Sequence, residues 1–137
     1  MASRHAKIWK ALKDHLESYP SLPDTVVYGG QSFDEPDPLT PYMIVDDVRF
    51  DPGRRYWRGV EWHTGSLAVH CMVPIHWDDL QSAEFAGALA DYFEPDAPMT
   101  YDDMTVRVAK QPAVSGAGHR DGSHFRLPVL VYWEGWG

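Results

Sequence analysis

Apolar and polar residues alternate between Gly65 and His76, which is the period of a β-strand with one face on a core. The row expected to face the core is Leu67, Val69, Cys71, Val73 and Ile75. The opposite row is mixed, so we expect that face to be partly wet or covered by another element. Pro74 lacks a backbone donor, which predicts a strand end or a sheet edge at this point. We expect the chain to be organised around this strand and the helix that follows it.

Two helices are predicted from caps and spacing. Asp78 with Gln81 three residues later is typical of a helix N-terminus, and Pro95 marks the far end. Small residues recur at three- and four-residue spacing within this segment, so we expect a largely buried helix lying against the sheet. An earlier helix from about Ser3 to Tyr19 has one apolar stripe, with four basic residues on its other side.

Further strands are predicted from β-branched and alternating segments on either side of the second helix. Their ranges are 25–28, 42–50, 56–62, 104–110 and 125–133, with a turn near His63, Thr64 and Gly65 and a glycine-rich loop at 111–123. The resulting order predicts a single α+β domain over residues 1–137. We expect a mainly antiparallel sheet with both helices packed on one face.

Composition narrows the possible functions. The 137 residues carry a formal charge of −8, which argues against nucleic-acid or anionic-membrane binding, since both depend on an excess of Lys and Arg. No apolar stretch is long enough to span a bilayer, and a polar N-terminus predicts that the usual secretory signal is absent. Cys71, the single cysteine, is expected to be a buried small hydrophobic residue.

Seven histidines invite a metal or catalytic hypothesis. His70 and His76 share a strand face, but six residues of extended chain separate them by roughly 20 Å. The sequence contains no zinc motif and no nucleophile elbow. We therefore expect no enzymatic activity, metal or cofactor, and keep as an alternative a small metal-dependent hydrolase using His70, His76 or His119.

The candidates for a contact surface are exposed basic and aromatic residues. Six tryptophans and seven tyrosines are many for this length, and such residues are enriched at protein interfaces. The candidates, chosen by chemistry and expected exposure, are Arg54, Arg55, Trp57, Arg58 and Trp62 on the predicted hairpin and His119 and Arg120 on the late loop. A solvated turn with solubilising charge explains the hairpin tip equally well.

The order of elements resembles the tail-terminator (tail-completion) proteins of long-tailed bacteriophages and related phage-like particles. The resemblance rests on chain size, the N-terminal amphipathic helix and the proline-rich passage from Pro36 to Tyr42 that enters a strand. The strand and helix from Leu67 to Phe93, and the strand pair from Met104 to Trp133 with its long loop, complete it.

The resemblance implies a non-enzymatic structural protein that forms a ring, usually a hexamer. Such a ring caps the completed tail tube and offers its other face to the head-side connector or stopper protein. It implies assembly in the host cytoplasm and then a place in the virion tail or neck. By exposure, the sheet edge near Pro74 and the aromatic residues Trp57 and Trp62 are expected to be ring contacts. The residues expected to contact the tube or the connector are Arg54, Arg55, Arg58, His119 and Arg120.

Other readings of the sequence make different predictions. Another head-tail neck component or a minor tail subunit would share most of these features. An acidic adaptor would bind a basic partner in a salt-sensitive way without self-association.

Overall fold

The computed structural model describes residues 3–23, 25–28, 39–46, 48–51, 55–57, 60–95, 98–114, 119–121 and 124–137. Within these ranges the chain forms the helices α1 (Arg4–Glu17) and α2 (Asp79–Tyr92). The strands are β1 (Val26–Tyr28), β2 (Tyr42–Val45), β3 (Arg49–Phe50), β4 (Arg55–Trp57), β5 (Val60–Pro74), β6 (Pro98–Tyr101), β7 (Met104–Val108), β8 (Ala113–Val114), β9 (His119–Asp121) and β10 (His124–Trp136).

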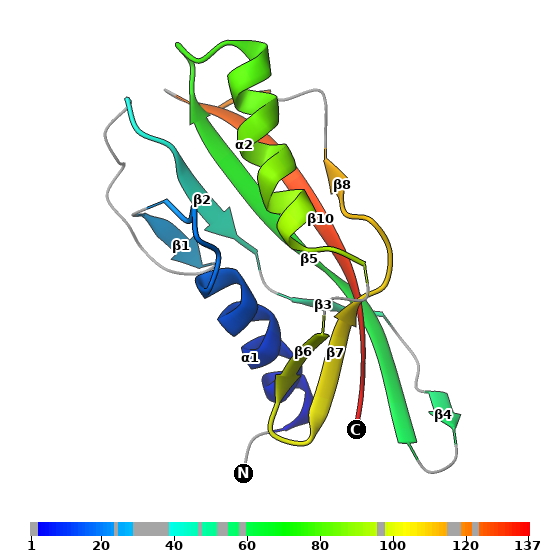
Figure 1. The fold of residues 1–137 in the computed structure, drawn as a ribbon. Coiled ribbons are helices and arrows are strands. Elements are labelled where there is room, and N and C mark those ends of the chain that lie inside the picture. The colour runs from blue at the N-terminus through cyan, green and yellow to red at the C-terminus, as the bar shows by residue number, and fades with distance from the viewer. Residues whose placement is uncertain are drawn as a thin grey trace.

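One mostly antiparallel sheet contains all of these strands, in the order β1-β2-β5-β10-β7-β6 with the short strands β3, β4, β8 and β9 added at its sides. Its axis is the ladder between β5 and β10, which runs from the pair Pro74 and His124 to the pair Trp62 and Trp136. The only parallel pairing among the described strands joins β1 and β2. Figure 1 shows this long, twisted ladder crossing the molecule. The predicted α+β fold is confirmed.

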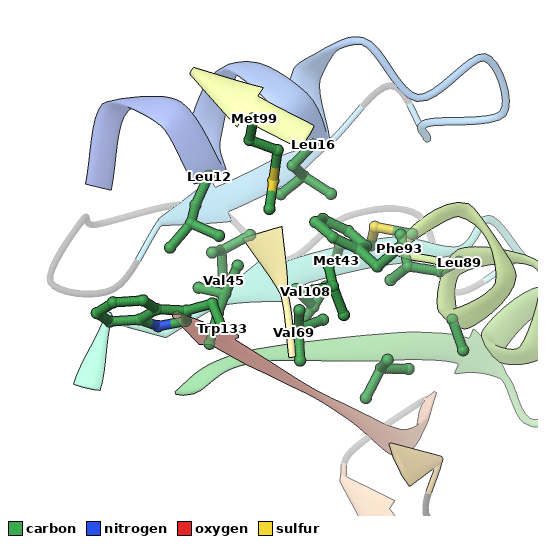
Figure 2. Close-up of a cluster of buried hydrophobic side chains, with 14 of the residues drawn as sticks. Leu12, Leu16, Met43, Val45, Val69, Leu89, Phe93, Met99, Val108 and Trp133 are labelled. Atoms are coloured by element: carbon green, nitrogen blue, oxygen red, sulfur yellow. The ribbon is translucent and has the colours of Figure 1, made fainter. Parts of the chain in front are cut away.

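Both helices cover the same face of the sheet. Leu12 and Leu16 of α1, Leu89 of α2 and Phe93 just after α2 belong to one buried cluster with odd-numbered residues of β5 and β10. Figure 2 shows these side chains converging above Val69 and the other core residues of the sheet. Cys71 lies in this core, free and buried, and burial raises the pKa of its thiol to about 12. The predicted hydrophobic role of Cys71 is therefore confirmed.

The predicted turn near His63, Thr64 and Gly65 is wrong, because β5 continues through these residues as one strand. A Cβ at Gly65 would lie 1.9 Å from the backbone oxygen of Arg49 and 2.6 Å from the indole of Trp133. This glycine therefore lets two neighbours approach the strand closely, which is the other common reason for glycine inside a strand.

The prediction that α2 is largely buried is also wrong. Its cap is as expected, with the amide of Gln81 donating to the Asp78 carboxylate at 2.7 Å, but its buried residues are confined to one side. Leu80 is 71% exposed, and Ala83 and Ala88 are exposed as well. A helix with apolar residues on all sides is normally covered on all sides. In this chain the outer side of α2 is open.

Pro74 ends β5, as predicted, but the expected ring contact at a sheet edge beside it is not supported. β5 lies between β2 and β10, so it is an interior strand, and Pro74 is buried. The predicted strand at 42–50 is divided into β2 and β3, both of which pair with β5.

Candidate interaction surface

The even-numbered residues of β5 and β10 form a second face of the sheet, opposite the helices. Along β10 this row comprises Arg126, Pro128, Leu130, Tyr132, Glu134 and Trp136, all half-buried. Among the described residues no helix lies on this row, because α1 and α2 both pack into the core on the other side. A sheet face with apolar and aromatic side chains is usually covered by another layer. This face is therefore the best place to look for a partner.

Aromatic and basic side chains gather at one end of this open face. Trp62 of β5 and Trp136 of β10 stack with ring centroids 4.7 Å apart and planes at 15°. The Arg107 guanidinium lies 5.3 Å from the Trp136 ring and bonds to the Glu134 carboxylate.

The same end of the face includes a second cation over an aromatic ring. The Lys110 ammonium lies 4.3 Å from the Tyr132 ring centroid. We call Trp62, Arg107, Lys110, Tyr132 and Trp136 the aromatic patch.

Its chemistry fits protein binding. Trp, Tyr and Arg are the residues that contribute most strongly at protein interfaces, because they bury a large area at small entropic cost and retain a polar group. The stacked pair is already ordered within the chain, so these two side chains would lose little conformational freedom on binding a partner. Glu134 neutralises Arg107, which leaves Lys110 as the charge that the patch presents.

Of the predicted contact residues, the structure places Trp62 in this patch. The others lie elsewhere in the sheet or outside the described residues. Arg55 and Trp57 lie in β4, where their backbones pair with the start of β5. The predicted candidates Arg54 and Arg58 lie outside the described residues. The side chains of Arg55 and Trp57 also lie outside the description.

The two candidates from the late loop, His119 and Arg120, lie in β9. Their backbones pair with Arg126 and Phe125, near the opposite end of β10 from Trp136. The sequence-based set is therefore divided between two ends of the sheet, and it does not form one surface.

Four members of the aromatic patch were not among the predicted candidates: Arg107, Lys110, Tyr132 and Trp136. The predicted strand at 125–133 ended before residues 134–137, whereas β10 continues to Trp136 and pairs with both β5 and β7. The alternation of Leu130, Tyr132, Glu134 and Trp136 against Val129, Val131 and Trp133 was the available signal.

The histidines do not gather into a site in the part of the chain that the structure describes. His70 Nε2 lies 2.7 Å from the Asp46 carboxylate on the open face, and His124 Nε2 lies 2.9 Å from the backbone oxygen of Thr40. Among the described residues, no group of three or more His, Cys, Asp or Glu side chains could hold a metal ion. In the same ranges, neither helix is long and apolar enough to cross a membrane.

Comparison with known protein families identifies the family of this chain. The sequence model of the phage tail terminator proteins matches residues 7–133, which is nearly the whole chain. The chain belongs to this family. It is therefore a structural component of phage tails, and the resemblance inferred from the order of elements is confirmed.

No curated protein matches the chain. Among solved structures 22 chains match, and one of them superposes with a TM-score of 0.65 at 19% identity over 94% of this chain and 90% of its own. At that identity the likeness shows a shared fold. It covers both helices and the sheet as a unit.

Proposed function

We propose that this terminator protein assembles into a ring, a hexamer, that caps the completed tail tube. The other face of the ring meets the head-side connector or stopper protein. Assembly takes place in the host cytoplasm, and the ring then remains in the tail or neck of the virion. The single observation that carries the proposal is the family match over residues 7–133.

The aromatic patch supports self-association. A ring needs a heterologous interface, in which one surface of a copy meets a different surface of the next and the rotation closes on itself. The patch supplies one such surface on a sheet face that the described helices leave open. The absence of a three-ligand metal group among the described residues gives the alternative hydrolase no support there.

Two measurements test the proposal together. Light scattering across a concentration series follows the mass from the 15.6 kDa chain toward a closed species of about six copies. Electron microscopy of purified tail tubes, with and without added protein, then shows whether the tube ends are capped. We expect a discrete ring and density at one end of each tube. A protein that stays monomeric and leaves tubes bare at every concentration would contradict the proposal.

A further inference from the structure

The outward side of α2 has small and apolar residues among its carboxylates. We call Leu80, Glu84, Gly87, Ala88 and Asp91 the α2 outer face, because helical spacing places them opposite the buried Ala86, Leu89 and Ala90. Leu80 is the most exposed large hydrophobic residue of the described chain, at 71%. Glu84, Ala88 and Asp91 are exposed, and Gly87 is half-buried.

Gly87 has no role in the packing of the isolated chain. A Cβ built on it meets nothing within 4 Å, so alanine would fit without any shift. Glycine inside a helix costs about 1 kcal/mol relative to alanine. Glycine at this position therefore lowers the stability of the helix without improving the packing of a single copy. The flat surface at Gly87 and Ala88 would, however, allow a large planar side chain from another molecule to lie against the helix.

The charges of the two surfaces indicate that the partner of the α2 outer face is a second copy of this chain. The chain has no Lys or Arg between residues 59 and 106, so the exposed charges of α2 are the carboxylates of Asp79, Glu84 and Asp91. The aromatic patch, in contrast, presents the Lys110 ammonium over the Tyr132 ring, four residues along β10 from the stacked indoles. An acidic helix with a small, apolar centre thus matches a basic patch with a large aromatic centre.

The two surfaces cannot meet within one chain. They lie on opposite faces of the sheet, and α2 follows the Pro74 end of the ladder while the patch lies at the Trp62 end. Twelve residue steps along the ladder span roughly 40 Å. Figure 1 shows α2 near one end of this ladder and the C-terminus at the other.

We infer that the α2 outer face of one copy docks on the aromatic patch of the next copy, with the stacked tryptophans over Gly87 and Ala88 and Lys110 facing the carboxylates of that helix. This inference rests on the proposed ring and specifies its contact. Because each copy carries both surfaces at different ends, the contact is heterologous and can repeat around a closed ring.

The first test uses a substitution that strengthens the helix while blocking the contact. Gly87→Gln replaces glycine with a better helix former in open space, so the variant should be at least as stable as the original chain. It should weaken self-association at least about thirtyfold, because an added side chain holds the indoles away. Ala6→Gln adds the same side chain at an exposed site on α1 and is the matched control.

A crossed mixture identifies the two surfaces. Lys110→Glu with Trp136→Ala removes the patch and leaves α2 intact, and Lys110→Glu alone serves if the pair disturbs folding, since Lys110 is exposed. The patch variant and Gly87→Gln should each remain monomeric alone. Mixed, they should form a dimer and nothing larger, because only one intact α2 outer face and one intact patch remain to meet.

The outcomes separate this inference from the proposed function. If Gly87→Gln forms rings and caps tubes as the original chain does, the docking inference is wrong and the proposed function stands. If the original chain neither associates nor caps tubes, both fail. If the crossed mixture stays monomeric while the original chain forms rings, the pairing of these two surfaces is excluded.

Discussion

The two helices lie on the same face of one sheet but have very different outer sides. α1 buries Ile8, Leu12 and Leu16 completely, and its other side has ion pairs such as Lys10 with Asp14 at 2.7 Å. α2 buries a comparable side and leaves Leu80, Ala83 and Ala88 open to solvent. The exposed side of α1 is mainly polar and forms ion pairs within the chain, whereas the exposed side of α2 includes apolar and small residues.

This difference separates the apolar residues that a single copy buries from those that it leaves exposed. Burial in the isolated chain accounts for every large apolar residue of α1. It leaves Leu80 71% exposed, on the same side of α2 as Gly87, where the inferred contact with the next copy would cover it. The same substitution should therefore have different effects on the two helices.

The largest expected effect compares two leucines truncated to alanine. Leu12→Ala should reduce the free energy of unfolding by about 2–5 kcal/mol, because Leu12 is 0% exposed and the core cannot fully close the cavity. Leu80→Ala should change it by less than about 0.5 kcal/mol. Urea unfolding followed by circular dichroism measures both. A large loss in Leu80→Ala would mean that this side chain supports the fold of a single copy.

Two glycines sharpen the comparison. Gly65→Ala should destabilise the chain by about 1–3 kcal/mol or more, because its Cβ would meet the Arg49 backbone at 1.9 Å and Trp133 at 2.6 Å. Gly87→Ala should stabilise it by about 0.5–1 kcal/mol, since the helix gains propensity and the space is empty. Thermal and urea unfolding of both variants measure whether each substitution raises or lowers the free energy of unfolding. Equal losses would show that Gly87 has a packing role in the monomer.

The elements that could be predicted from the sequence are those fixed by local pattern. Alternation identified β5, β7 and β10, an apolar stripe identified α1, and the Asp78 cap identified α2, where the Gln81 amide donates to the Asp78 carboxylate. The Ser3 hydroxyl also caps α1, by accepting from the Ala6 amide. These features depend on residues a few positions apart. The helices on one face followed from the same patterns, because the apolar rows had to meet.

Two of the failures involve contacts between distant segments. Gly65 resembled a turn residue because nothing nearby in the sequence reveals that Arg49 and Trp133 press against it. The aromatic patch depends on a register that sets Trp62 against Trp136, and no local pattern fixes that register. The exposure of α2 was missed for a different reason. Periodicity marks which residues are apolar, and it does not reveal whether they are covered by the same chain or by another.

The stacked pair between the helices predicts a pH effect. His15 of α1 stacks on Tyr92 of α2 with centroids 4.5 Å apart, and the Tyr92 hydroxyl donates to the His15 backbone oxygen at 2.7 Å. Burial lowers the pKa of His15 below its ordinary value of 6.5, because desolvation disfavours the charged imidazolium. The unfolded chain therefore binds this proton more readily than the folded chain.

The direction of the pH effect on stability follows from this difference between the folded and unfolded pKa of His15. Above pH 6.5 the imidazole is neutral in both states and its packing contributes fully, and the contribution falls as the pH drops below 6.5. His15→Phe keeps a ring in the stack without a titrating group, so its stability should fall less over the same interval. Urea unfolding at several pH values compares the two chains. Parallel pH profiles would show that His15 titrates alike when folded and unfolded.

The smallest expected effect on stability comes from an ion pair on the exposed side of α1. The Lys7 ammonium lies 2.6 Å from the Asp103 carboxylate and 2.9 Å from that of Asp102, in the turn between β6 and β7. Hydrogen bonds to Asp103 and then Asp102 raise the pKa of Lys7, and Lys7 lowers that of Asp103. Both carboxylates are well exposed, so water and salt screen the attraction.

Lys7→Ala should therefore lower the thermal midpoint less than any destabilising change above, and the difference from the original chain should shrink as salt is added. Melting curves in low and high salt test this, with Lys10→Ala on the same helix for comparison, since Lys10 pairs with Asp14 one turn along the helix. A loss that persists in high salt would mean that Lys7 holds α1 to the β6–β7 turn through its aliphatic stem. In that case packing on the sheet, more than charge, would complete the outer side of α1.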